Sequence, residues 1–321
     1  MGPRSPRRQG VISQAPRIEG RIVAAGLTKV FGQITAVDDL SFSVEPGSVT
    51  GFLGPNGAGK TTTLRMILGL AAPTSGTGTI SGVTYAHLPA PGRMVGAVLE
   101  ATSFHPGRSA RNHLRVFCAA AGLPDRRADE VLELVGLTQA ARYAVHGFSL
   151  GMRQRLGLAT ALLGNPRVLL LDEPANGLDP EGIAWLRGLL RHFADVDGRT
   201  VLISSHVLSE VEQTVDRVVI IARGRLIYEG RLADLEGASA GVVVRTPNPD
   251  QLSAAVAPLN VKITPRADGS LAVVGATPEA VGRAAWQARV ELHELRAGSS
   301  SLEETFLRLT AEPSNPPGPG A

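Results

Sequence analysis

A glycine-rich segment carries the first chemical signal. It reads Gly54-Pro-Asn-Gly-Ala-Gly-Lys-Thr61 and stands between a strand-like run ending at Leu53 and a helix-like run over Thr62–Leu70. Glycines at this spacing let backbone N–H groups converge on phosphate oxygens, and the start of the helix adds the positive end of its dipole. An ordinary glycine-rich turn is the alternative, but the strand and helix flanks disfavour it. We expect Lys60 to contact the β- and γ-phosphates of a nucleotide and the Thr61 hydroxyl to ligate Mg²⁺.

Two adjacent carboxylates supply a second signal. Asp172 and Glu173 directly follow the apolar run Val168–Leu171, which is typical of a strand buried on both faces. Carboxylates at such a place are costly unless they meet a metal ion or water. We expect Asp172 to hold Mg²⁺ through its water shell and Glu173 to act as general base for the attacking water. A strand that simply ends at the surface is the alternative, and the glycine-rich loop makes it less favoured.

Composition and charge limit the classes of protein. The 321 residues suggest one large domain and a smaller one, and 43% hydrophobic residues suffice for real cores. The net charge of +3 is uneven, because five arginines and one glutamate give the first 21 residues +4. The body is therefore not a strongly basic surface, and we expect no nucleic-acid partner. Only Lys29, Lys60 and Lys262 are lysines among the 32 basic residues, so each lysine is worth locating.

The sequence lacks the features of a membrane-spanning or disulfide-bonded chain. The most apolar runs are only a few residues long, whereas a bilayer span needs 18 or more. The basic N-terminus has no apolar stretch behind it, so we expect no secretory signal. Cys118 is the single cysteine, which excludes an intramolecular disulfide and fits a reducing compartment.

The chain divides into segments of different character. Residues 1–20 mix Pro, Gly, Arg and Ser without periodicity and predict a flexible basic extension; it could touch anionic lipid, but a solvated extension is favoured. Residues 21–237 alternate short β-branched runs with helical stretches, which predicts an α/β domain with ligands beyond the carboxyl ends of its strands. The clearest predicted strands are Val49–Leu53, Val168–Leu171, Thr200–Ser204 and Arg217–Ala222.

Residues 238–312 predict a small α+β accessory domain. Its predicted elements follow the order β-α-β-β-α-β, which is the split ferredoxin-like arrangement. A last helix over Ser301–Leu309 begins with a capping box, Ser301 and Glu304. This domain could stabilise a dimer or regulate one. Residues 313–321 are rich in Pro and Gly and predict a disordered tail. The predicted elements of this domain are Gly241–Arg245, Pro249–Ala257, Val261–Thr264, Leu271–Val274, Pro278–Arg289 and Glu291–Leu295.

A third motif identifies a family. Phe148-Ser-Leu-Gly-Met152 opens a helix before the Asp172 strand, and with the earlier motifs residues 21–237 resemble the ATP-binding subunit of an ABC transporter. In that family the matching stretch is the signature loop, which caps the γ-phosphate of ATP held by the opposite subunit. Here Leu150 and Met152 replace the usual Gly and Gln, so backbone donors survive and the glutamine contacts do not. Ser149 also fits a structural N-cap, and the two roles can coexist.

The resemblance implies roles for further residues. Asn176-Gly-Leu-Asp179 resembles the D-loop, through which one subunit senses the site of the other. His206 stands where the family has its switch histidine, so the resemblance implies Glu173 and His206 as catalytic residues. Phe31 matches the aromatic that stacks on adenine, although a core aromatic would look the same. The residues expected to bind nucleotide are Phe31, Gly54, Pro55, Asn56, Gly57, Ala58, Gly59, Lys60, Thr61, Thr62, Ser149, Gly151 and Asp179.

The main departure from the family pattern lies among the expected metal ligands, just before the expected helical subdomain. The resemblance implies Thr61, Asp172 and Glu100 as Mg²⁺ ligands, with Glu100 at the Q-loop position where the family has glutamine. A carboxylate keeps the capacity to bind Mg²⁺ but loses the amide donor and adds negative charge. Residues 101–164 would form the helical subdomain that docks on membrane subunits. His105, His113 and Cys118 in it lack metal-ligand spacing and are expected to be packing or surface residues.

The fold class expected is therefore α/β, a P-loop NTPase of the ABC ATPase type with a helical subdomain and a small C-terminal α+β domain. The resemblance extends to ATPase subunits of ABC-2-type exporters, including drug- and antibiotic-resistance pumps. It implies two copies that bind ATP between them and drive a separately encoded permease at the cytoplasmic face of the membrane. A soluble ABC ATPase acting on ribosomes or nucleic acid is the alternative. A non-hydrolytic nucleotide-binding module is another, which Glu173 and His206 disfavour.

Overall fold

The computed structural model describes residues 19–99, 104–239, 241–266, 268–297, 306 and 309–310. Residues 1–18 of the predicted extension, Glu100, the capping-box residues Ser301 and Glu304, and the predicted tail 313–321 lie outside the described residues. Within the described part of the chain, no helix is both long and apolar enough to cross a bilayer.

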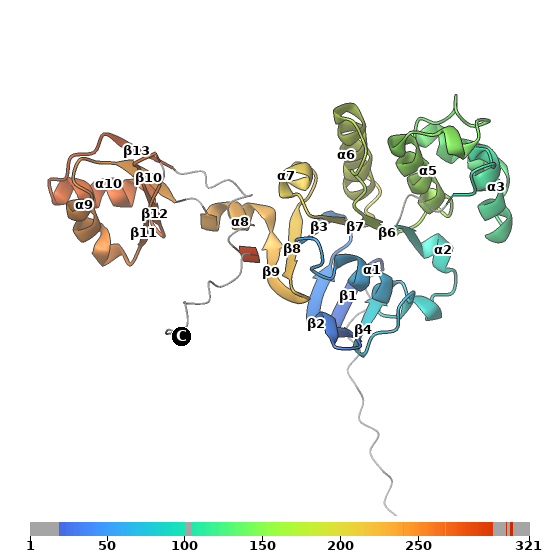
Figure 1. Cartoon of the computed structure of the whole chain (residues 1–321), viewed down its shortest axis with the longest axis horizontal. Coiled ribbons are helices and arrows are strands. Elements are labelled where there is room, and N and C mark those ends of the chain that lie inside the picture. The colour runs from blue at the N-terminus through green and yellow to red at the C-terminus, as the bar shows by residue number, and fades with distance from the viewer. Residues whose placement is uncertain are drawn as a thin grey trace, which may run out of the picture.

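A six-stranded sheet forms the centre of the first domain (Figure 1). Its strand order is β5-β6-β7-β3-β8-β9, and only β9 runs antiparallel to its neighbour. The four clearest strands predicted from the sequence are all present, and each lies within one residue of its expected bounds. The strands are β3 (Ser48–Leu53), β5 (Val95–Val98), β6 (Val168–Asp172), β7 (Thr200–Ser205), β8 (Arg217–Ala222) and β9 (Arg225–Arg231).

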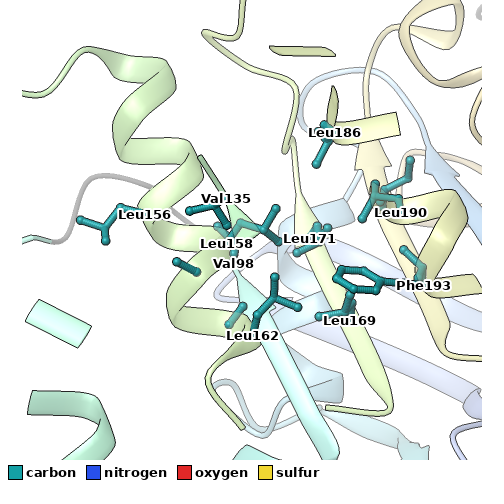
Figure 2. Packing of buried hydrophobic residues seen from close by; sticks show 14 of the residues in the cluster. Val98, Val135, Leu156, Leu158, Leu162, Leu169, Leu171, Leu186, Leu190 and Phe193 are labelled. Carbon is teal, nitrogen blue, oxygen red and sulfur yellow. The ribbon is translucent and has the colours of Figure 1, made fainter. Parts of the chain in front are cut away.

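The central strands separate two hydrophobic cores, because side chains alternate between the faces of a strand. In β6, Leu169 and Leu171 belong to one core, whereas Val168 and Leu170 belong to the other. Figure 2 shows the first core, in which leucines of α5 (Leu150–Leu162) and of α6 (Pro180–Asp195) pack around β6. Burial on both faces explains why this strand is continuously apolar until it ends at Asp172.

The second core lies beneath α1 (Lys60–Ile67) and a separate antiparallel sheet of order β2-β1-β4. The strands are β1 (Ile22–Phe31), β2 (Ile34–Val44) and β4 (Ser75–Ile80). The sequence did not predict this sheet. Its register is interrupted at several places, and β4 reads Ser-Gly-Thr-Gly-Thr-Ile, so neither alternation nor β-propensity marks it clearly.

Short helices form the subdomain that follows β5. Ser109 caps α3 and Ser149 caps α5, since each hydroxyl accepts a hydrogen bond from the backbone N–H three residues on. The N-cap role predicted for Ser149 is confirmed. The subdomain contains α3 (Ala110–Ala120), α4 (Arg126–Leu134), a 3₁₀ turn at Val145–Gly147 and α5. Two shorter helices lie elsewhere in the first domain: α2 (Pro91–Met94) follows a 3₁₀ turn at Tyr85–His87 and precedes β5, and α7 (Leu208–Val211) follows β7.

The C-terminal domain is a four-stranded antiparallel sheet with two helices on one face (Figure 1). The order β11-β12-β10-β13 and the sequence β-α-β-β-α-β give the predicted ferredoxin-like topology. The last strand begins at Glu294 rather than at Glu291. After it the chain returns to the first domain, where Phe306 is buried in the same core as Leu235 of α8. The elements are α8 (Leu232–Ser239), β10 (Val242–Arg245), α9 (Pro249–Val256), a 3₁₀ turn (Ala257–Leu259), β11 (Lys262–Pro265), β12 (Leu271–Val274), α10 (Pro278–Gln287) and β13 (Glu294–Ala297).

Candidate active site

The strand order brings the predicted catalytic groups together. Strand β7 lies between β6 and β3, with Ser204 opposite Asp172 and Ser205 opposite Leu53. The glycine-rich loop, the carboxylate pair and His206 therefore leave the sheet side by side at the carboxyl ends of three neighbouring strands. This edge is where parallel α/β sheets bind ligands.

The loop from Gly54 to Gly59 has little room for side chains. A Cβ on Gly54 would lie 2.5 Å from the carbonyl oxygen of Ile221, and one on Gly59 would lie 2.5 Å from that of Ala36. Gly59 also has φ of 101°, which disfavours any other residue, and it caps α1 without a side-chain acceptor. The first N–H groups of α1 therefore have no side-chain cap, and Asn56 and Gly57 are exposed at the tip of the loop. Pro55 is also exposed, whereas Ala58 is buried and Thr62 is half-buried on the first turn of α1.

Lys60 is buried, with only 7% of its surface exposed. Its Nζ donates to the carbonyl oxygen of Gly54 at 2.7 Å and lies 3.6 Å from a carboxylate oxygen of Glu173. Burial lowers the pKa of Lys60, and the negative charges of Glu173 and Asp172 oppose that shift. A desolvated ammonium group beside open backbone N–H groups is well suited to bind phosphate oxygens.

Thr61 and Asp172 place two hard oxygen ligands next to each other. The Thr61 hydroxyl donates to Oδ2 of Asp172 at 2.6 Å, and the Ser204 hydroxyl donates to Oδ1. Asp172 is 8% exposed, so its charge is held by hydroxyl groups rather than by bulk water. Oxygen donors of this kind are the ligands that Mg²⁺ takes, usually with phosphate and water completing the octahedron. The donor set therefore fits Mg²⁺.

Glu173 and His206 form the second polar pair. Nδ1 of His206 lies 3.0 Å from both carboxylate oxygens of Glu173. The backbone of Glu173 is held as well, because its N–H donates to the Ser204 hydroxyl at 3.0 Å and its carbonyl accepts from the Gln154 amide at 3.4 Å. Glu173 has φ of 48°, a strained value for a residue other than glycine. These contacts fix the carboxylate toward His206 and Lys60.

Phe31 lies at the end of β1 and is 53% exposed, so it is not a core aromatic. The β1–β2 hairpin reaches the loop through Ala36, whose carbonyl abuts Gly59. It also reaches the β8–β9 turn, where the Asp38 N–H donates to the Gly224 carbonyl at 2.9 Å. The ring thus belongs to a hairpin that packs on the glycine-rich loop.

Ser149, Gly151 and Asp179 form a second group. They line a hollow of about 400 Å³ between α5, the start of α6 and the segment 136–140, and its lining includes no residue of the glycine-rich loop. Asp179 caps α6, accepting from the Gly182 N–H at 2.8 Å. Leu150 packs against Gly177 so closely that a Cβ on this glycine would clash with the Leu150 side chain. The two loops are therefore in contact within one chain.

Sequence reasoning missed three contributors. Ser204 links Asp172 to the backbone of Glu173, and its signal was a hydroxyl within an otherwise apolar strand end. Gln154 is 7% exposed and donates to the Glu173 carbonyl. Its polar side chain near the start of α5 could suggest a buried contact, but the sequence does not indicate the partner. The replacement at Leu150 is visible in the sequence, but its contact with Gly177 is not, because it joins segments distant in the chain.

Comparisons with known proteins agree with this geometry. A family model described as ABC transporter matches residues 37–176, and a model described as a domain of unknown function (DUF8746) matches residues 240–303. The bacitracin transport ATP-binding protein BcrA of Bacillus licheniformis is 47% identical over 210 residues, which cover 65% of this chain and 69% of that protein. The ABC transporter ATP-binding protein YcbN of Bacillus subtilis is 36% identical over 292 residues, 88% of this chain and 95% of the relative.

Solved structures show the same fold. The ATP-binding subunit of an ABC transporter superposes with a TM-score of 0.61 at 29% identity, over 67% of this chain and 92% of the other. A dimeric bacterial ABC transporter cassette does so with a TM-score of 0.61 at 24% identity, over 66% of this chain and 98% of that chain. This chain belongs to the ATP-binding proteins of ABC transporters. It is a P-loop ATPase, the transporter subunit that binds and hydrolyses ATP.

Proposed function

We propose that two copies of this chain bind two ATP molecules between them and power the export of antibiotic-like compounds. The observation that carries the dimer is the division of the site. Lys60, Thr61, Asp172, Glu173 and His206 share one edge of the sheet, whereas Ser149 lines a hollow that no glycine-rich-loop residue enters. A second copy would bring its capped helix start to the phosphates that the first copy holds. The dimeric cassette of the same fold supports this arrangement.

Thr61 and Asp172 would hold Mg²⁺ through the oxygens that now face each other. When bound, the ion neutralises charge on the β- and γ-phosphates. The Ser204 hydroxyl orients the Asp172 carboxylate beside Thr61, where both residues would hold the ion. Lys60 would exchange its carbonyl partner at Gly54 for phosphate oxygens, which relieves the cost of its burial.

Glu173 would accept the proton of the attacking water as general base, and His206 would orient that carboxylate and contact the γ-phosphate. The contact between His206 and both oxygens of Glu173 supports this pairing. Ser149 and Gly151 would present N–H groups of α5 to the γ-phosphate on the partner, and the Ser149–Met152 cap keeps that helix start ordered.

The functions of similar proteins support export. BcrA of Bacillus licheniformis is a bacitracin transport ATP-binding protein, and a Nod factor export protein and a lantibiotic transport protein are also similar to this chain. We infer a separately encoded permease as the partner and a peripheral place at the cytoplasmic face of the membrane. Because these similar proteins act in transport, export is favoured over the action of an ATPase on ribosomes or nucleic acid.

Sizing of the full-length protein tests the proposal. Lys60→Ala should lose ATP binding, whereas Glu173→Gln should bind ATP with Mg²⁺ and elute as a dimer. Removal of Mg²⁺ by EDTA should abolish hydrolysis by the wild-type protein. A Glu173→Gln protein that stays monomeric at saturating ATP and Mg²⁺ would contradict the shared site. Co-purification with ribosomes in place of a membrane protein would contradict the transport role.

A further inference from the structure

Lys29 lies next to the exposed ring of Phe31. Its Nζ is 4.9 Å from the centre of the ring, the distance of a cation–π contact. Lys29 is half-buried, while Phe31 remains 53% exposed. The ammonium group therefore covers part of the ring and leaves the rest open to a ligand.

Lys29 is also tied to the element that carries the phosphate loop. Its Nζ donates to the carbonyl oxygen of Ala72 at 2.7 Å, in the segment that directly follows α1. Two more bonds hold the same segment, from the Thr74 N–H to the Thr28 carbonyl at 2.8 Å and from the Val30 N–H to the Thr74 hydroxyl at 3.0 Å. Because α1 begins at Lys60, these bonds link the end of β1 to the helix that starts at the phosphates.

We propose that Lys29 is a positioning residue, which holds the Phe31 ring for stacking against the adenine of ATP at a set distance from the phosphate loop. This inference rests on the proposed role of Phe31. One face of the ring meets the ammonium group, and the open part meets the base. A cation on one face of an arene also withdraws electron density from the other, which favours stacking with the electron-rich adenine.

The chain offers a matched set of lysines for the test. Lys29→Met keeps the length and removes the charge, Lys29→Arg keeps the charge, and Lys262→Met is a control on the exposed strand β11 of the C-terminal domain. The full-length protein is assayed for kcat and KM with ATP. Inhibition of hydrolysis by inorganic tripolyphosphate, which has no base to stack, reports the phosphate site alone.

We expect Lys29→Met to raise KM for ATP about three- to fivefold without changing kcat or the tripolyphosphate inhibition constant. Lys29→Arg should recover part of the loss, and Lys262→Met should match the wild type. Phe31→Ala should raise KM about tenfold by loss of stacking. Lys29→Met should then add nothing in the Phe31→Ala background, because both changes remove one interaction.

The outcomes separate the two hypotheses. If Phe31→Ala leaves KM unchanged, the stacking role fails and the role of Lys29 fails with it. If Phe31→Ala raises KM but Lys29→Met does not, or if the two effects multiply, the role of Lys29 is overturned and stacking stands. An equal loss of tripolyphosphate inhibition in Lys29→Met would show that the lysine acts on phosphates, which also overturns the proposal.

Discussion

His206 and Glu173 meet through one ring nitrogen and two carboxylate oxygens, with Nδ1 3.0 Å from each oxygen. The two residues come from the ends of adjacent strands, β7 and β6. Nζ of Lys60 lies 3.6 Å from the same carboxylate, so Glu173 faces both the His206 ring and the Lys60 ammonium group. This pairing is the basis of the proposed role of Glu173 as general base.

Glu173→Gln removes the proton acceptor but keeps the shape of the side chain. We expect steady-state hydrolysis to fall by about 10²- to 10⁴-fold while ATP binding persists. Phosphate release at saturating ATP and Mg²⁺ measures the rate, and Glu133→Gln, an exposed position on α4, is the control. Hydrolysis by Glu173→Gln at the wild-type rate would exclude Glu173 as general base.

Gly177 touches Leu150 where the segment 176–179 meets the start of α5. Gly177→Ala places a Cβ into the Leu150 side chain and also strains a residue with φ of 77°. We expect the ATPase rate to fall at least about tenfold, because the proposed shared site depends on both segments. Gly188→Ala is the control, because a Cβ at this glycine of α6 meets open space.

The double variant Leu150→Gly with Gly177→Ala separates the clash from the backbone strain. Leu150→Gly removes the side chain that the new Cβ would meet, so part of the ATPase rate should return. The strain at φ of 77° remains and limits the recovery. A double variant no faster than Gly177→Ala alone would show that the contact between the loops is not the cause.

Glu100 carries a separate prediction, although it lies outside the described residues. Strand β5 ends at Val98, opposite Leu171, so the chain leaves the sheet beside the strand that ends in Asp172. On the proposed role of Glu100 as a Mg²⁺ ligand, Glu100→Gln removes one negative charge from the nucleotide site and supplies the amide that the family resemblance implies at this position. We expect ATP to bind about fivefold more tightly, from a repulsion of about 1 kcal/mol, with a changed Mg²⁺ dependence. Unchanged ATP affinity, Mg²⁺ dependence and turnover would refute Glu100 as a metal ligand.

The candidate site residues at the carboxyl ends of β3 and β6 could be predicted because their sequence signals are local. Gly54–Thr61 and Val168–Glu173 are contiguous segments whose spacing alone fixes a loop and a strand end. Burial of β6 on both faces made its apolar run unmistakable. The ferredoxin-like order was also readable, since its strands and helices alternate with clear turn residues between them.

The remaining features depend on contacts between distant segments. Strand β1 pairs with β4, about 50 residues further along the chain, and the glycine-rich β4 resembles a turn. Lys29 meets Ala72, and Leu150 meets Gly177, only after the chain has folded. No periodicity or motif records such pairs, so a single sequence indicates the residues proposed to bind phosphate more readily than the residues that position them.

His113 leads to the last prediction, because it is 4% exposed on α3. Its ring packs between Phe104 and Phe117, with centres 5.0 and 4.9 Å away. Burial, with a contribution from the charge of Arg108, lowers the pKa of His113 to about 4 from an ordinary value of 6.5. The unfolded chain therefore binds a proton at pH 5 that the folded chain does not, so stability falls as the pH drops from 6.5 toward 4.

His113→Phe should remove this part of the acid sensitivity, since phenylalanine fills a similar space between the two rings and does not titrate. The slope rises from about half of 1.4 kcal/mol per pH unit at pH 6.5 to nearly the full value at pH 5, so the wild type should lose about 1.6 kcal/mol over this range through this residue. Urea unfolding across this pH range measures the difference between the two proteins, and His105→Phe changes an exposed histidine nearby as the control. If His113→Phe loses stability as steeply as the wild type, the buried ring is not the group that destabilises the fold in acid, and other groups must account for that loss.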